Sequence, residues 1–159
     1  MIPIQNIYYM LSYAFQVLNE QGYKSVATEH FENVADLCAA ILIKGLSKQL
    51  KRGLMKDYIP KREPLTALRG KMEISETLKT NSIIKRQVVC SYDEFSENAY
   101  MNRIIKTTML RLMVADVDKS RKKEMKKLLV FLGNVEPLPI YSINWNLRYD
   151  RNNQTYRML

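Results

Sequence analysis

The chain has 159 residues, of which 47% are apolar, five are Gly and five are Pro; this composition excludes low-complexity disorder and favours one folded domain. Its formal net charge of +9 favours a polyanionic partner, either nucleic acid or an acidic protein face, although a solvated basic surface explains the charge equally well. The sequence has no basic leader and no apolar run long enough to span a bilayer, so we expect a cytoplasmic protein without membrane contact.

The first amphipathic pattern covers residues 4–18, where apolar side chains recur at three- and four-residue spacing and predict a helix. Pro3 suits the first turn of this helix, and Gly22 ends the pattern. The apolar stripe comprises Ile4, Ile7, Tyr8, Leu11, Phe15 and Leu18. Tyr9 and Tyr13 lie on a neighbouring face, which makes them candidates for a partner interface because Tyr combines an apolar ring with a polar tip.

A second stripe predicts a helix from about residue 31 to residue 52, formed by Phe31, Val34, Cys38, Ile41, Leu42 and Leu46. Lys51 and Arg52 complement the negative end of its dipole, and Gly53 can adopt a left-handed cap. Cys38 and Cys90 both lie in apolar stretches, so we expect two buried free thiols in a reducing compartment.

The segment from residue 58 to residue 93 predicts a small antiparallel sheet. Pro60 and Pro64 exclude a helix there, while residues 69–74 and 85–92 have the composition of short strands. One helical turn can form over residues 75–80. The expected fold class is therefore α+β, mainly helical with a two- to three-stranded antiparallel sheet. Basic side chains line the edges of that sheet and discourage unwanted pairing.

Two further helices are predicted towards the carboxyl end. Ser96 can cap the first, whose stripe comprises Met101, Ile104, Ile105, Thr108, Met109 and Leu112. Asp118 or Ser120 begins the second, which ends at Gly133. The side chains of this helix that are predicted to face the core are Met125, Leu128, Leu129 and Leu132. A brief strand is expected over residues 143–147, and residues 150–159 can begin one more helix.

The sequence contains no set of residues that predicts catalysis or metal binding. The single histidine, His30, lies at a predicted helix start and has no motif around it. Residues 124–126 read Glu-Met-Lys with aspartates upstream, which is the spacing of a metal-dependent nuclease, but Met125 faces the core of a helix and we reject the set. Asp93, Glu94 and Glu97 are typical of a turn followed by a helix start. We therefore expect no catalytic residue, no metal ligand and no enzyme activity in this chain alone.

Two basic regions are candidates for binding. One predicted helix carries a dense row of cations suited to nucleic-acid phosphates, formed by Lys119, Arg121, Lys122, Lys123, Lys126 and Lys127. A solvated face that only keeps the protein soluble is the alternative. Around the sheet, the candidates for contacts to a partner protein or a phosphate are Arg69, Lys71, Lys85 and Arg86.

Three stretches carry a more specific signal: IPIQNIYYMLSYA at residues 2–14, LRGKMEI at residues 68–74 and NRIIKTT at residues 102–108. In order and approximate spacing they resemble the McrC family, and the resemblance covers essentially the whole chain. Within these motifs we expect a core position for Tyr8, Leu11 and Ala14. We expect Gly70 to allow a close backbone approach or a bulge, and Asn102 to form a hydrogen bond with the neighbouring sheet.

The resemblance implies a subunit of a modification-dependent, 5-methylcytosine-specific restriction system. In the McrC family the amino-terminal half contacts McrB, a GTP-hydrolysing hexamer, and the carboxy-terminal half carries the nuclease residues. Residues 1–149 are then expected to form the ring-binding domain, and residues 150–159 to begin a helix leading to a nuclease domain beyond residue 159. GTP and Mg²⁺ are expected in the ring and a divalent metal in the nuclease half, so no cofactor is expected in this chain.

The expected function is a non-catalytic assembly module that binds and stimulates the McrB-like ring and tethers a nuclease, with DNA as a further partner. A stand-alone basic DNA-binding domain from a degenerate restriction locus is the alternative from a different class. A third possibility, a metal-dependent nuclease in its own right, requires convergent carboxylates that the sequence does not show.

Overall fold

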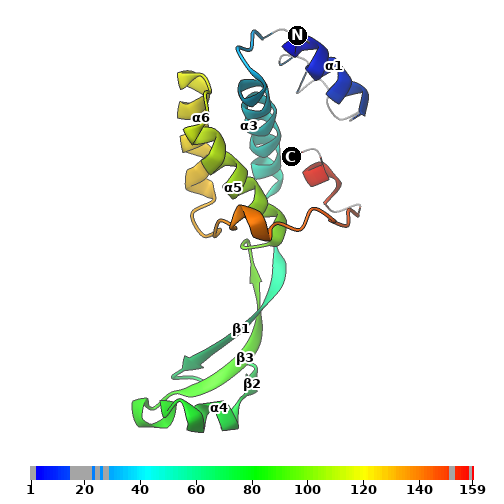
Figure 1. Cartoon of the computed structure of the whole chain (residues 1–159). Coiled ribbons are helices and arrows are strands. Elements are labelled where there is room, and N and C mark those ends of the chain that lie inside the picture. Colours follow the sequence, from blue (N-terminus) through cyan, green and yellow to red (C-terminus); the bar gives the residue numbers. More distant parts are fainter. Residues whose placement is uncertain (1–2, 15–22, 24–25, 27–28, 151–152, 158) are drawn as a thin grey trace. The chain divides into compact units, whose positions relative to one another are not determined.

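The computed structural model describes residues 3–14, 23, 26, 29–150, 153–157 and 159. The chain forms two compact units, a helical unit (Met1–Met55 with Tyr100–Leu159) and a sheet unit (Lys56–Ala99). The sheet unit is therefore an insertion between two helices of the helical unit (Figure 1). The predicted fold class, α+β and mainly helical with a small antiparallel sheet, is confirmed.

The helical unit is organised around its longest described helix. The described helices of this unit are α1 (Ile4–Ala14), α3 (Val34–Arg52), α5 (Tyr100–Val114) and α6 (Lys119–Phe131), with the short 3-10 helices η3 (Ile140–Ser142) and η4 (Gln154–Arg157). α3 contacts α5 and α6 through one core and α1 through another. Leu42 and Leu46 of α3 belong to the main core, whereas Leu37 and Ile41 belong to a second core around Tyr8. Two cores on one helix explain why its apolar residues exceed a single stripe.

Helix ends follow the sequence in part. Asn33 caps α3 by accepting a hydrogen bond from the Asp36 amide, and Gly53 ends it with φ +96°. Asp118 caps α6 as predicted. The predicted cap at Ser96 is wrong, because Ser96 is the last residue of a strand and α5 begins at Tyr100.

Several burial and capping predictions need correction. The cap predicted at Gly133 is wrong, since α6 ends at Phe131, Leu132 follows as its cap and Gly133 has no positive φ. Val34 and Cys38 of α3 are exposed, because they lie four positions apart on a side of the helix that neither buried cluster covers. Of the two thiols predicted to be buried, only Cys90 is buried. Ala14, at the end of α1 and at the margin of its stripe, is exposed as well.

The described residues of the carboxyl end form no strand. The strand predicted over residues 143–147 is wrong: these residues have no strand partner in the described part of the chain, and the Asn144 amide instead donates to the Tyr100 hydroxyl at 2.7 Å. Further on, η4 forms a single 3-10 helix. Phe15, Leu18 and Gly22 of the first predicted helix lie outside the described residues.

The sheet unit consists of three antiparallel strands and two short helices: β1 (Asp57–Leu65), β2 (Lys71–Met72), α4 (Ile74–Lys79), η2 (Ser82–Lys85) and β3 (Val88–Ser96). The strand order is β1-β3-β2, so the long β3 is central (Figure 1). The buried hydroxyl of Thr77 in α4 accepts a hydrogen bond from the Val89 amide of β3 at 2.9 Å. This contact fixes α4 to the sheet.

β1 is a strand in spite of its two prolines. Pro60 and Pro64 pair with Asp93 and Val89 of β3, and β1 lies at the edge of the sheet. Residues an even number apart direct their backbone N–H positions to the same side of a strand. With a spacing of four, both prolines can therefore face the free edge, where no ladder hydrogen bond is lost.

Candidate functional site

The LRGKMEI motif forms a tight crossing over the central strand. Gly70 has φ +68°, and a Cβ atom there would lie 2.4 Å from the Ser91 carbonyl oxygen and 2.7 Å from Cβ of Tyr92. Only glycine fits this position, since both the backbone conformation and the space exclude a side chain. The close backbone approach predicted for Gly70 is confirmed. It fixes the directions in which Arg69 and Lys71 leave the chain.

Arg69 and Lys71 differ in how firmly they are held. The Arg69 guanidinium lies 4.1 Å from the centre of the Tyr92 ring, a cation–π distance. The Tyr92 hydroxyl donates to the Glu63 carboxylate, and this hydrogen bond raises the pKa of Tyr92. The Lys71 side chain is 78% exposed, and its ammonium lies 3.6 Å from the Glu73 carboxylate. Arg69 is thus pre-oriented by an aromatic face, whereas Lys71 makes only an exposed ion pair that is easily exchanged for another.

Several other cations of the sheet unit are neutralised by ion pairs. Lys61 contacts Glu94, and Arg62 contacts both Glu73 and Glu76. Glu94 was expected in a turn; it lies instead within β3, where Lys61 reaches it from β1 and lowers the pKa of the Glu94 carboxyl through a side-chain hydrogen bond. Asp93 also lies within β3, opposite Pro60. The expected acidic turn is therefore a strand.

The sheet unit exposes a large amount of apolar surface. Its exposed large apolar side chains include Leu68, Met72, Ile74, Leu78, Ile83 and Ile84, the last at 82% exposure. Lys85 and Arg86 follow Ile84 directly and are also exposed. Among the described residues, no carboxylate lies within 4.0 Å of either cation. Cations next to apolar groups are typical of a surface that is covered by another macromolecule.

On α1 the two tyrosines of the proposed interface face outward. Tyr9 is 60% exposed and Tyr13 is 92% exposed. Tyr8 of the same helix is buried and donates a hydrogen bond to the Tyr23 carbonyl at 3.2 Å. The structure therefore separates the core tyrosine of this motif from the two solvent-facing ones, as the spacing predicts.

The NRIIKTT motif holds neighbouring loops in place. Its buried Asn102 donates to the Met55 carbonyl at 2.7 Å and accepts from the Tyr156 hydroxyl at 2.8 Å. The Met55 amide donates to the same hydroxyl, so Met55, Asn102 and Tyr156 form a closed network of hydrogen bonds. The partner of Asn102 is thus the segment that precedes the sheet unit, and not the sheet as expected.

The cations of the same motif complete this scaffold. Lys106 donates to the Leu132 and Val135 carbonyls, where it complements the negative end of the α6 dipole. Arg103 donates to the Glu136 carbonyl at 3.1 Å. These side chains fasten the loop after α6 to α5, so the motif serves to position backbone.

Arg121 does not belong to the exposed basic face of α6. Its guanidinium lies 2.6 Å from the Asp36 carboxylate, 3.0 Å from Glu29 and 4.8 Å from the centre of the Phe31 ring. Its side chain is only 15% exposed. Burial alone lowers the pKa of Arg121, but the hydrogen bonds to Glu29 and Asp36 raise it. The exposed position predicted for Arg121 is therefore wrong, because the residue links α6 to α3.

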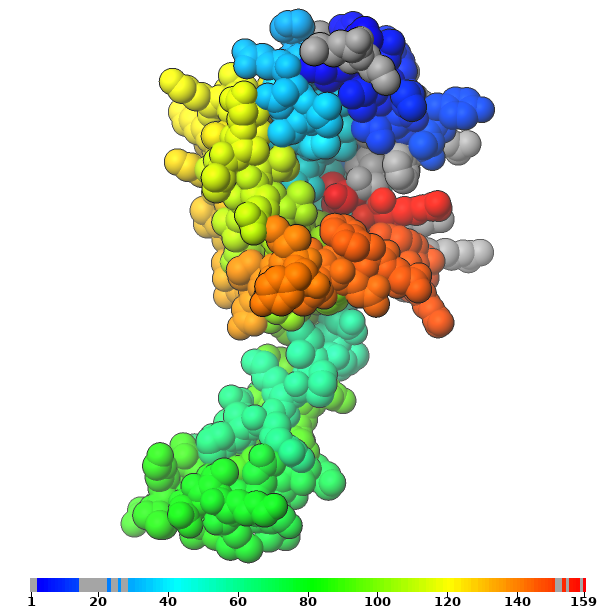
Figure 2. All heavy atoms as spheres, viewed as in Figure 1, coloured from blue at the N-terminus to red at the C-terminus, as the bar shows by residue number. Residues whose placement is uncertain are grey.

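The remaining cations of that predicted set stay together on the surface. Lys119, Lys123, Lys126 and Lys127 are exposed and Lys122 is half-buried. Figure 2 shows the α6 segment, in yellow, at the surface of the helical unit. These five lysines are called the α6 lysine row below.

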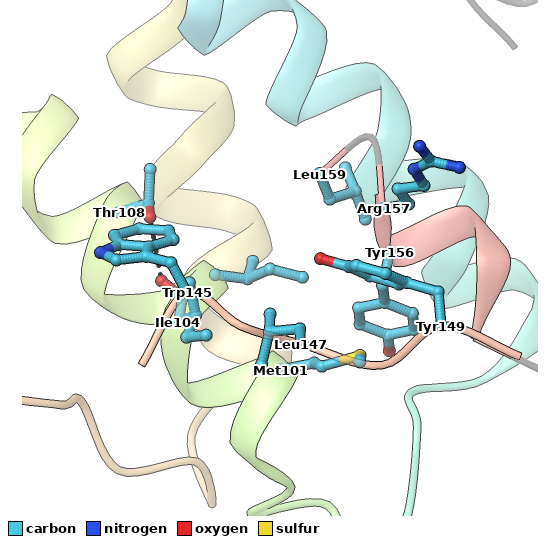
Figure 3. Close-up of a pocket in the computed structure, with 10 residues that line it drawn as sticks. Met101, Ile104, Thr108, Trp145, Leu147, Tyr149, Tyr156, Arg157 and Leu159 are labelled. Carbon is cyan, nitrogen blue, oxygen red and sulfur yellow. Dashed lines mark hydrogen bonds between the residues drawn. The ribbon is translucent and has the colours of Figure 1, made fainter. Parts of the chain in front are cut away.

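A hollow in the helical unit is lined mostly by apolar and aromatic side chains. It encloses about 350 Å³ between α5 and the carboxy-terminal segment, with Ile104, Trp145, Tyr149 and Tyr156 in its wall (Figure 3). The described residues around it include no carboxylate, histidine or cysteine. Within the described ranges no group of three or more His, Cys, Asp or Glu residues is placed to hold a metal ion.

The structure also locates the single histidine and the Glu-Met-Lys set considered for catalysis or metal binding. His30 is exposed before the Asn33 cap. Glu124 and Lys126 are exposed on α6, while Met125 between them is fully buried. In the described part of the chain, no helix is long and apolar enough to cross a membrane.

A family model described as McrBC 5-methylcytosine restriction system component matches residues 4–159. The chain belongs to this family. Over 112 residues it is 33% identical to the Type IV methyl-directed restriction enzyme EcoKMcrBC of Escherichia coli (strain K12), in a match that covers 70% of this chain and 32% of that protein. The resemblance expected from the three motifs is confirmed, and the chain is a component of a McrBC restriction system.

Two solved structures share the fold of this McrBC component. A chain of the Thermococcus gammatolerans McrBC complex matches with a TM-score of 0.65 and 17% identity, covering 98% of this chain and 48% of that chain. A chain of the half-complex from a tetradecameric assembly of T. gammatolerans McrB AAA+ hexamers with bound McrC matches with a TM-score of 0.63 and 16% identity, covering 98% and 38%. At these identities the likeness concerns the fold alone. This chain spans less than half the length of each of these three relatives.

Proposed function

We propose that this chain is the ring-binding assembly module of its McrBC system, and that it stimulates GTP hydrolysis by a McrB-like hexamer and tethers a nuclease. The single observation that carries the proposal is the exposed apolar and cationic surface of the sheet unit. The likeness in fold to chains from complexes of McrB hexamers with McrC supports it. The 5-methylcytosine target is expected from the family alone.

The apolar surface supports a protein partner on energetic grounds. Full burial of one Leu or Ile side chain contributes about 1.5–3 kcal/mol. The sheet unit leaves Leu68, Met72, Ile74, Leu78, Ile83 and Ile84 in solvent, while its own core is very small. A partner that covers even part of this surface gains much of that free energy. We take a McrB-like ring as this partner because the resemblance to the McrC family implies it.

The neighbouring cations support a partner with acidic groups. Arg69 is already oriented by the Tyr92 ring, so little side-chain entropy is lost when it meets a carboxylate. Lys71, Lys85 and Arg86 add charge that is exposed on the same unit. On α1, Tyr9 and Tyr13 form a second candidate contact. We assign these six residues to partner binding.

The chain itself is proposed to be non-catalytic. GTP and Mg²⁺ belong to the ring in this proposal, and a divalent metal belongs to a nuclease segment that is outside these 159 residues. Cys38 and Cys90 are free thiols, which fits the reducing cytoplasm as the place of action. The residues after Tyr149 then form the connection toward the nuclease.

The test is GTP hydrolysis by the cognate McrB-like ring with and without the chain. We expect stimulation, and we expect the double variant Arg69→Gln, Lys71→Gln to need about tenfold more chain for half-maximal effect, the equivalent of one lost interfacial charge contact. Lys51→Gln with Arg52→Gln, at the end of α3, is the charge-matched control. A further variant, Ile84→Ser, removes apolar contact without touching the core of the sheet unit.

If the Arg69→Gln, Lys71→Gln variant and the Ile84→Ser variant both stimulate the ring as well as the unaltered chain, these three residues do not belong to the interface. Failure of the unaltered chain to stimulate the ring, together with failure to bind it in a pull-down, would refute the assembly module. The stand-alone DNA-binding domain would then be the leading function, and the α6 lysine row would be its first candidate surface.

A further inference from the structure

We propose that the α6 lysine row binds the phosphate backbone of duplex DNA without sequence preference. None of its residues is among those assigned to the ring, so this proposal does not depend on the ring-binding function. Its residues are Lys119, Lys122, Lys123, Lys126 and Lys127.

The geometry places all five cations on one face. Lys119, Lys123 and Lys127 follow each other at intervals of four, and Lys122 and Lys126 flank the same row. The first and the last lie eight positions apart on the helix, which corresponds to about 12 Å. The opposite face of α6 is fixed to the core by Met125, which is fully buried, and by Arg121. The row therefore cannot turn inward.

The charge of the row is available to a ligand. No carboxylate in the described part of the chain lies within 4.0 Å of any of the five ammonium groups, and α6 contains a single acid, Glu124. Asp118, which directly precedes the helix, accepts hydrogen bonds from both the amide and the hydroxyl of Ser120. The sheet unit shows the opposite pattern, since Lys61 and Arg62 are paired with glutamates there.

The side chains of the row fit nucleic acid better than protein. Lysine is depleted at protein interfaces, where aromatic residues and Arg are enriched, so a surface of five lysines in nine positions is unusual for a protein contact. Lysine ammonium groups act as point charges on phosphates, and phosphate contacts position a protein on a duplex without carrying sequence information. One exposed aromatic ring, that of Phe131, follows Lys127 by four positions, whereas single-stranded bases stack on several successive aromatic rings. Closely spaced cations on one helix face fit the dense phosphate charge of a duplex, which is greater per unit length than that of a single strand.

The test is fluorescence anisotropy of a labelled duplex of about 20 base pairs, titrated with the 159-residue chain at several salt concentrations. Each neutralised phosphate contributes about 0.9 to the slope of log K against log salt, so contacts by four or five lysines predict a slope of about −4. The double variant Lys123→Gln, Lys127→Gln should reduce the magnitude of that slope by about 2 and weaken binding roughly tenfold at low salt. Lys123→Arg with Lys127→Arg should keep the slope.

The control is the double variant Lys51→Gln, Arg52→Gln, which lowers the net charge by the same amount at the end of α3. It should keep the salt slope of the unaltered chain. Equal slopes for the α6 variant and this control would overturn the proposal, because binding would then follow net charge alone. Absence of duplex binding at about 50 mM salt, or tighter binding to a single strand of the same length, would overturn it as well.

Discussion

The helical unit and the sheet unit are stabilised in different ways. The helical unit buries two apolar clusters, and Leu37, Leu46, Met109 and Met125 in it have essentially no exposed surface. In the sheet unit the buried apolar residues are few and small, namely Val89, Cys90 and Ala99. That unit is held instead by a nine-residue strand pairing, the buried Thr77 hydroxyl and surface ion pairs.

The contrast shows where the sequence is free to serve binding. In the helical unit, most apolar residues are committed to packing, and a change there alters the fold. In the sheet unit, apolar residues such as Ile83 and Ile84 are 57% and 82% exposed, so folding alone does not account for them. A sheet of three strands needs few buried residues of its own when its surface is completed by a partner. The two units therefore require different tests.

The largest expected effect concerns the ion pairs that link α6 to α3. Arg121→Met should lower the free energy of unfolding of the helical unit by about 3 kcal/mol, because it leaves the Asp36 carboxylate buried without its cation. Urea denaturation followed by circular dichroism measures this loss. Lys123→Met on the same helix removes an exposed cation and should change stability by less than about 0.5 kcal/mol. If the two variants are equally stable, the buried pair does not hold the helices together.

A smaller and local effect is expected at the crossing over β3. Gly70→Ala should cost about 1–3 kcal/mol within the sheet unit, because φ is +68° and the new Cβ atom meets the Ser91 carbonyl. Amide hydrogen exchange should accelerate at residues 71–73 and 88–92 and stay unchanged in α3. Gly53→Ala also places a side chain at a positive φ but meets nothing within 4 Å, so it shows the effect of backbone strain without a clash, and it should leave exchange in the sheet unit unchanged. Equal acceleration throughout the chain would show that the two units unfold together.

The helices could be predicted because their signals are local. Periodic apolar residues located α3, α5 and α6, and Asp118 marked the start of α6 through its own side-chain hydrogen bond. The close approach at Gly70 could be predicted for the same reason, since an isolated glycine in a strand-like segment indicates close backbone approach, although the observed strand β2 begins only at Lys71. These features depend on a few neighbouring residues.

The errors occurred where a distant segment decides the outcome. β1 was missed because its prolines are tolerated only at a sheet edge, and the sequence does not show which strand is at the edge. The sequence groups Arg121 with the exposed lysines because its partners, Asp36 and Glu29, are 85 and 92 residues away. The network around Asn102 joins residues 55, 102 and 156 and has no local signature. Among the described residues, the exposure of most candidate cations could be predicted from the sequence, but their ion pairing could not.

The smallest expected effect is a pH dependence confined to the sheet unit. A hydrogen bond from Ser91 and the nearby cations Lys71 and Arg62 hold the pKa of the Glu73 carboxyl below its ordinary value of 4.5, and Lys61 does the same for Glu94. A carboxyl whose pKa is lowered by folding stabilises the fold above its unfolded pKa, and this stabilisation is lost as the pH falls through the folded pKa. Between about pH 6 and pH 3, amide protection in β1 and β3, corrected for intrinsic exchange, should therefore decrease a few-fold. Glu94→Gln should remove part of this dependence, and an unchanged profile in that variant would show that the exposed Lys61–Glu94 pair contributes nothing measurable.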